Sequence, residues 1–255
     1  MKTRRDRFDE VPDTYERARA LYRPEILAAL QAQAALGPGV RVLEIGCGTG
    51  QLTRDLLPFG VTLTAIEPGR ALADKARTVL PESVRIDVAR FEDWNPGDRR
   101  FDVVVAAQSL HWIDPAQRFD RIAHTLVPGG ICALIWTLDR SEHSDFYRAT
   151  QPVYERAFPP SSPGESLDLP SEAALACDQL TAHAAFGPIS TTRVNWTRTM
   201  NTETYLDLRR TDSNVRALPE DRRREFLDGL RAVLQRFGGQ VAREYETLLF
   251  ATHRS

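Results

Sequence analysis

Three glycines at alternate positions follow an apolar run in the segment VLEIGCGTG, residues 42–50. Glycine inside a regular element costs about 0.5–1 kcal/mol relative to alanine, so Gly46, Gly48 and Gly50 indicate a sharp turn or a ligand lying close to the backbone. Glu67 ends the next apolar run along the chain, in the segment TAIEP. A carboxylate at that position can accept two charge-assisted hydrogen bonds from the hydroxyls of a ribose.

Three kinds of ligand compete for this glycine turn. A dinucleotide fingerprint, GxGxxG, would place its third glycine at position 51, where the chain has Gln51, so a pyrophosphate site is disfavoured though not eliminated. A P-loop needs a lysine followed by serine or threonine after the last glycine, and Gln51-Leu52 stands there instead. The favoured ligand is a nucleoside without phosphate, with Glu67 on its ribose.

Apolar runs alternate with helical patterns along residues 37–140, which predicts an α/β fold with a doubly wound parallel sheet. In such sheets ligands bind at the carboxyl ends of the strands, near the point where strand order reverses. The pattern predicts a helical stretch over 13–36 divided at Pro24, a Pro/Ser-rich loop over 159–170, and a helical stretch over 201–238 broken near Leu218-Pro219. The predicted strands are 40–45, 61–66, 84–88, 101–107, 131–136, 189–199 and 244–252.

Composition narrows the possible partners. The 255 residues carry a net charge of -2 and no basic stripe, so we expect no nucleic-acid partner. No apolar stretch is long enough to span a membrane and the N-terminal residues lack the apolar core of a signal peptide, which favours a cytoplasmic protein with no membrane partner. The three cysteines, Cys47, Cys132 and Cys177, have no metal-ligand spacing, so no metal is expected. The oligomeric state cannot be inferred from the sequence.

Four segments together resemble the class I S-adenosylmethionine-dependent methyltransferases: VLEIGCGTGQLTRDL, AIEP, AAQSLHWID and LVPGG. The AAQSLHW segment is similar to a narrower subgroup that contains the trans-aconitate-type and related small-molecule methyltransferases. The resemblance implies a seven-stranded, mostly parallel, Rossmann-like sheet whose last strand is antiparallel. It also implies a single domain over 1–255, with an N-terminal helical lid over 1–36, a cofactor-binding core over 37–140, and substrate-side helices with the final strands over 141–255.

The resemblance assigns roles to individual residues. Glu44 would face the methionine end of the cofactor, and Glu67 would bind the ribose. Phe91 stands where the family usually has a smaller residue, so contacts in this loop are less defined. The expected cofactor-binding residues are Tyr15, Arg19, Glu44, Gly46, Gly48, Gly50, Glu67, Pro68, Phe91, Glu92, Gln108 and Trp112.

Fewer residues of the sequence indicate how the methyl acceptor is bound. His111 is either a scaffold histidine, or it orients the substrate or acts as its general base. Tyr22, Arg209 and Arg210 are candidate substrate contacts, although helix packing and solvated surface arginines explain such residues equally well. We therefore expect methyl transfer from S-adenosylmethionine to a small molecule, favouring an oxygen nucleophile, a carboxylate or hydroxyl. The alternatives are a methyltransferase acting on a macromolecule and a non-catalytic protein that binds S-adenosylmethionine.

Overall fold

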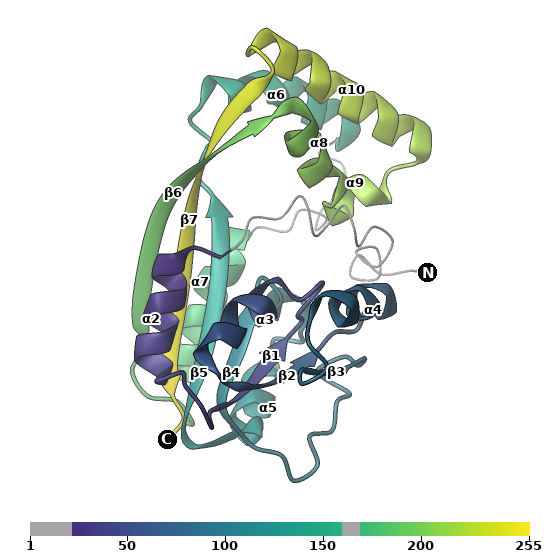
Figure 1. Cartoon of the computed structure of the whole chain (residues 1–255). Coiled ribbons are helices and arrows are strands. Elements are labelled where there is room, and N and C mark those ends of the chain that lie inside the picture. Colours follow the sequence, from purple (N-terminus) through teal and green to yellow (C-terminus); the bar gives the residue numbers. More distant parts are fainter. Residues whose placement is uncertain (1–21, 160–168) are drawn as a thin grey trace. The chain divides into compact units, whose positions relative to one another are not determined.

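A seven-stranded sheet with the strand order β3-β2-β1-β4-β5-β7-β6 is the centre of the fold. This computed structural model describes residues 22–159 and 169–255 (Figure 1). In chain order the strands are β1 (Arg41–Ile45), β2 (Thr62–Ile66), β3 (Arg85–Asp87), β4 (Phe101–Ala107), β5 (Leu126–Asp139), β6 (Ser190–Asn201) and β7 (Gln240–His253).

The direction of the strands matches the prediction. β1 pairs in parallel with β2 and β4, β2 with β3, and β4 with β5, whereas β7 runs in the opposite direction (Figure 1). The mostly parallel, doubly wound, Rossmann-like sheet with an antiparallel last strand is therefore confirmed. The chain leaves β1 toward β2 on one side, and β4 later adds to the other side of β1. The carboxyl ends of β1 and β4 thus form the switch point where such sheets bind ligands.

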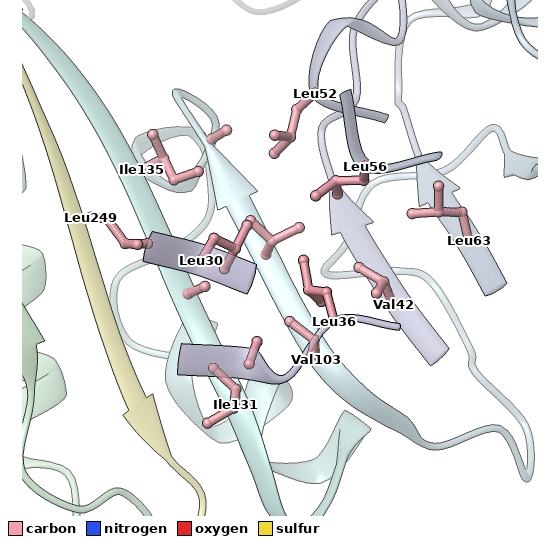
Figure 2. Close-up of a cluster of buried hydrophobic side chains, with 14 of the residues drawn as sticks. Leu30, Leu36, Val42, Leu52, Leu56, Leu63, Val103, Ile131, Ile135 and Leu249 are labelled. Carbon is pink, nitrogen blue, oxygen red and sulfur yellow. The ribbon is translucent and has the colours of Figure 1, made fainter. Parts of the chain in front are cut away.

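Helices cover the sheet and join its strands. Leu30 of α2, Leu56 of α3 and Ala76 of α4 belong to one buried cluster, much of which Figure 2 shows, together with side chains of β1, β4 and β5. Arg118 of α5 donates from Nε to Gln179 Oε1 of α7 at 3.0 Å. The helices are α2 (Pro24–Ala34), α3 (Gln51–Leu56), α4 (Arg70–Val79), α5 (Arg118–Thr125), α6 (Asp145–Ala157), α7 (Leu169–Ala182), α8 (Thr202–Arg210), α9 (Ser213–Ala217) and α10 (Glu220–Arg236), with short 3₁₀ turns at Leu57–Phe59 and Leu110–Trp112.

The described residues divide into two compact units. The glycine-loop unit holds 22–137, 169–194 and 247–255, and the helical unit holds 138–159 and 195–246. Strands β5, β6 and β7 contribute residues to both units. None of the helices within these described ranges is long and apolar enough to cross a bilayer.

The sequence also predicts a turn at VPGG (127–130) and a helix N-cap at Asp114, and its pattern indicates no helix over 171–188; the structure differs on all three points. Residues 169–182 form α7, a helix that the sequence pattern did not indicate. The VPGG segment belongs to β5, because a bulge between the Phe101–Leu126 and Val103–Ile131 pairs accommodates it without a turn. Asp114 does not cap α5, which begins after Gln117; its carboxylate instead accepts from the backbone N–H of Ala116.

Candidate functional site

The glycine turn that follows β1 has three residues with left-handed backbone. Gly46, Gly48 and Gly50 have φ values of 74°, 57° and 88°. A Cβ on Gly46 would lie 2.5 Å from Ser109 Cβ, so glycine is required there by the protein's own packing at the end of β4. The turn is tied to β2 as well, since the N–H of Gly46 donates to Ile66 O at 2.7 Å.

Glu67 directly follows β2 and points its carboxylate at this turn. Oε2 accepts from the N–H of Gly48 at 2.9 Å, and Oε1 accepts from the N–H of Gly69 at 2.8 Å. The residue is 5% exposed. An ionised carboxylate only accepts hydrogen bonds, so both contacts hold Glu67 against backbone donors at this turn. The structure thus brings Glu67 and the glycine turn together, while the predicted ribose contact stays a prediction.

Glu44 lies inside the protein near the end of β1, with 2% exposure. Thr53 Oγ1 of α3 donates to its Oε2 at 2.5 Å. Burial raises the pKa of the Glu44 carboxyl to about 7; the hydrogen bond from Thr53 opposes this shift, and the charges of Glu67 and Asp55 add to it. Glu44 is therefore a carboxyl that changes charge near neutral pH.

Gln108, which follows β4, combines an unusual backbone with an unsatisfied side chain. Its φ is 56°, in the left-handed region that non-glycine residues rarely adopt. Its Nε2 donates to Thr137 O at 2.7 Å, and its Oε1 is buried with no hydrogen-bond partner among the described residues. The next residue, Ser109, donates from its hydroxyl to Ile45 O at the end of β1.

His111 and Trp112 lie in the 3₁₀ turn after Gln108. The His111 ring is 4.8 Å from the Trp112 ring and 5.3 Å from the ring of Trp136 on β5, measured between centroids. Trp136 is 1% exposed, and its Nε1 has no hydrogen-bond partner in the part of the chain that the structure describes. The imidazole therefore makes tilted ring contacts with two indoles.

The loop after β3 holds the residues predicted beside the adenine. Phe91 is 1% exposed, and the guanidinium of Arg121 lies 5.4 Å from its ring centroid. Glu92 and Pro68 are half-buried. Stacking of Phe91 on a ligand, and the adenine contacts of this loop, stay predictions.

The remaining predicted site residues belong to the two predicted helical stretches. Tyr15 and Arg19, predicted to bind the cofactor, lie outside the described residues, and Tyr22, predicted to contact the substrate, packs against the cluster of Figure 2. In the helical unit Arg209 Nη1 is 3.0 Å from Asp212 Oδ2, and Arg210 Nη1 is 2.6 Å from Asp207 Oδ1. Burial lowers the pKa of the Arg209 guanidinium, but Asp212 and nearby tyrosines raise it further, so its net shift is upward.

Sequence reasoning missed several polar partners at the carboxyl ends of the strands. Thr53, Ser109 and Thr137 contact Glu44, Ile45 O and Gln108; Thr53 and Ser109 lie within the segments that carry the resemblance, but the resemblance assigns them no role, and Thr137 lies outside these segments. Thr49 Oγ1 is buried and has no hydrogen-bond partner among the described residues. In residues 22–159 and 169–255, no three His, Cys, Asp or Glu side chains gather as metal ligands.

The chain resembles known methyltransferases in sequence and in structure. Residues 43–134 match the family described as "Methyltransferase domain". An uncharacterized methyltransferase of Mycobacterium tuberculosis is 30% identical over 227 residues, which cover 89% of this chain and 85% of that protein.

Two solved structures share the fold. A putative type II methyltransferase from Anaeromyxobacter dehalogenans is 22% identical, with a TM-score of 0.59 and coverage of 91% of this chain and 97% of that one. A methyltransferase from Thiobacillus denitrificans, solved with S-adenosylhomocysteine, is 17% identical, with a TM-score of 0.56 and coverage of 96% and 97%. Given the extent of the mycobacterial match and the glycine turn with Glu67, the chain belongs to the methyltransferase family.

Proposed function

We propose that the protein transfers the methyl group of S-adenosylmethionine to an oxygen atom, a hydroxyl or carboxylate, of a small molecule and releases S-adenosylhomocysteine. The observation that carries this proposal is the contact of Glu67 with the N–H of Gly48 at the switch point of the sheet. Membership of the methyltransferase family and the bound S-adenosylhomocysteine of the Thiobacillus denitrificans protein support the choice of cofactor.

The residues at this end of the sheet fit a nucleoside with an amino-acid chain. Glu67, which contacts the glycine turn through the N–H of Gly48, is the carboxylate placed to accept from the ribose hydroxyls. Thr49 Oγ1 is a buried polar atom without a hydrogen-bond partner in the described ranges, which suits a polar ligand at the turn. Glu44 would serve the methionine end, while Pro68, Phe91, Glu92 and Trp112 would surround the adenine side.

When bound, S-adenosylmethionine supplies a methyl group already activated by a positively charged sulfur. The protein then has to orient the acceptor and exclude water, and good orientation can lower a barrier by about 7–11 kcal/mol. His111, held between Trp112 and Trp136, is our candidate for the base that removes a hydroxyl proton. A carboxylate acceptor would need no base.

A small acceptor is favoured over a macromolecule. The net charge of -2 gives no electrostatic reason for nucleic-acid binding, and the resemblance of AAQSLHW to the trans-aconitate-type subgroup points the same way. We further propose that 1–255 form one methyltransferase domain, in which Tyr15, Arg19 and Tyr22 close over the ligands. Arg209 and Arg210 would help bind an acidic acceptor, although Asp212 and Asp207 already offset their charges.

The test is methyl transfer from tritiated S-adenosylmethionine to a panel of small hydroxyl, carboxylate and amine compounds. We expect a labelled product with an oxygen acceptor. The Glu67→Ala variant should form no labelled product. His111→Ala should reduce transfer to hydroxyls more than transfer to carboxylates. Transfer to amines alone would contradict the oxygen assignment, and binding of S-adenosylmethionine without transfer to any acceptor would favour a non-catalytic protein.

A further inference from the structure

We propose that Gln108 Oε1 accepts a hydrogen bond from the methyl acceptor, so that the site prefers a hydroxyl over a carboxylate. This inference rests on the proposed function and narrows its acceptor class. Gln108 would then be a specificity-determining residue, which neither the comparisons nor the sequence motif assigns.

The orientation of the Gln108 amide is fixed by its neighbours. Nε2 lies 2.7 Å from Thr137 O, and a carbonyl oxygen can only accept, so the NH₂ group must face it. Reversing the amide would bring two oxygens to that distance. The backbone is fixed too, because the N–H of Gln108 donates to Ile135 O at 2.9 Å. The hydrogen bond of Nε2 therefore assigns the other amide position to Oε1.

This orientation leaves an unfavourable arrangement in the structure as it stands. Oε1 is shielded from solvent and has no partner among the described residues, which costs the desolvation of a polar atom. The backbone of Gln108 adds a second cost, because its φ of 56° is left-handed. Ala35, the other non-glycine residue of the described ranges with positive φ, follows α2 at its C-cap, an ordinary place for this conformation.

Both costs fall at the carboxyl end of β4, next to the turn after β1. Ser109 connects the two strand ends by donating to Ile45 O. A buried, oriented acceptor at the switch point is suited to a ligand that brings a donor. The glutamine oxygen cannot be satisfied by an anion, since a carboxylate has no proton to donate and its charge would oppose the amide dipole.

A hydroxyl acceptor fits this oxygen. The hydroxyl would donate its hydrogen to Gln108 Oε1, which leaves a lone pair of the hydroxyl oxygen available for the methyl carbon. The acceptor oxygen forms the new bond to carbon as the carbon–sulfur bond breaks, with its electron pair retained by sulfur. A hydroxyl has one hydrogen, so this hydrogen leaves Gln108 Oε1 as the new bond forms: the methylated oxygen becomes strongly acidic and releases its proton to His111, the base proposed above, because the weakly basic amide oxygen does not keep it. Gln108 thus orients the acceptor and does not take up the proton.

Gln33 provides a matched control within the glycine-loop unit. Its Nε2 donates to Thr192 Oγ1 at 3.1 Å and its Oε1 is also buried without a partner among the described residues, but it lies on α2 and not at a strand end. Gln108→Gly removes the oxygen and relieves the positive φ, and this relief offsets the loss of the hydrogen bond to Thr137 O, so we expect the variant to fold. Gln33→Ala removes an equally buried amide oxygen, but from α2 and not from the end of a strand.

The test measures binding of 4-fluorophenol and 4-fluorobenzoate by ¹⁹F NMR, in the presence of saturating S-adenosylhomocysteine. We expect the wild type to bind the phenol more tightly than the benzoate. Gln108→Gly should weaken phenol binding about tenfold and leave benzoate binding unchanged, whereas Gln33→Ala should keep the wild-type preference. Gln33→Ala should bind S-adenosylhomocysteine as the wild type does in calorimetry, and the same titration of Gln108→Gly separates an acceptor contact from the cofactor contact that the resemblance implies for this residue.

Three results would overturn the inference. The first is wild-type binding of benzoate as tight as that of the phenol, or no binding of the phenol. The second is an unchanged preference in Gln108→Gly. The third is a tenfold loss of affinity for S-adenosylhomocysteine in Gln108→Gly, which would assign the oxygen to the ammonium group of the cofactor. Failure of the wild type to bind S-adenosylhomocysteine would instead remove the proposed function itself.

Discussion

The two units of the molecule satisfy their buried polar groups in different ways. In the helical unit, arginines are paired with acids of the same unit: Arg209 with Asp212, Arg210 with Asp207, Arg243 with Asp139 and Arg140 with Glu246. Nε of Arg209 is a buried atom that lacks a partner among the described residues. The charges of the helical unit are therefore largely compensated by the unit itself.

At the strand ends of the glycine-loop unit, carboxylates are held by neutral donors. Glu67 accepts from the N–H groups of Gly48 and Gly69, and Glu44 accepts from the hydroxyl of Thr53. Thr49 Oγ1 and Gln108 Oε1 have no hydrogen-bond partner among the described residues. Buried acceptors without a partner among the described residues suit a ligand site, so this comparison favours Gln108 over Arg209 and Arg210 as a binding residue.

The largest effect should come from closing the glycine turn. Gly46→Ala places a Cβ 2.5 Å from Ser109 Cβ at a φ of 74°, so we expect the free energy of unfolding to fall by about 3 kcal/mol. Gly39→Ala is the control, because its φ is 90° but a Cβ there meets nothing within 4 Å. Gly39→Ala should lower the free energy of unfolding by about 1 kcal/mol. Equal losses in urea denaturation would show that Ser109 does not require glycine at 46.

A smaller loss of folding stability should follow from breaking an ion pair in the helical unit. Asp139→Asn leaves Arg243, which is 7% exposed, without its anionic partner, and should lower the free energy of unfolding by about 2 kcal/mol. Affinity for S-adenosylhomocysteine should not change. Glu203→Gln, which breaks the exposed pair with Arg231, should cost less than about 1 kcal/mol. A large loss of ligand affinity in Asp139→Asn would extend the site to this pair.

The pH dependence of stability should report on Glu44. Its pKa is raised from 4.5 to about 7, so between these values the folded state binds more protons than the unfolded state. The free energy of unfolding should therefore fall as pH rises from about 4.5 to 7, with no further contribution above that window. Glu44→Gln should remove this part of the slope. Identical pH profiles for wild type and variant would mean that burial does not shift Glu44.

The smallest effect is expected for the partly exposed ion pair between Arg210 and Asp207 of α8. Arg210 and Asp207 have side chains 35% and 30% exposed, so Arg210→Gln should change stability by less than about 1 kcal/mol. If the acceptor is an acid, KM should rise in the double variant Arg209→Gln/Arg210→Gln while kcat is kept. An unchanged KM for an acidic acceptor would remove both arginines from the acceptor site.

Features encoded by local spacing could be predicted from the sequence. Alternating apolar runs and helical patterns predicted the sheet, and the glycines with Glu67 predicted that these residues meet after β1 and β2. In α7, the buried residues Ala173, Ala176 and Leu180 follow a helical spacing, but small alanines gave too weak a contrast with their neighbours. The break at Leu218-Pro219 is present, and a second one separates α8 from α9.

Contacts that depend on strand pairing could not be predicted in this way. The bond from Gln108 Nε2 to Thr137 O requires the register of β4 against β5, and that from Ser109 to Ile45 O requires the register of β1 against β4. Neither partner has a distinctive local pattern. The left-handed backbone of Gln108 is equally unexpected, because glutamine gives no signal for positive φ.

Calorimetric titration of S-adenosylhomocysteine into wild type, Glu67→Ala and Glu203→Ala tests the central claim most directly. Since hydrogen bonds to a charged group contribute about 1.5–3 kcal/mol each, we expect Glu67→Ala to bind about 100-fold more weakly or worse. Glu203→Ala, which changes an exposed acid of the helical unit, should bind as the wild type does. Equal affinities in all three folded proteins, or no binding by the wild type, would contradict the assignment of Glu67 and the glycine turn to this cofactor.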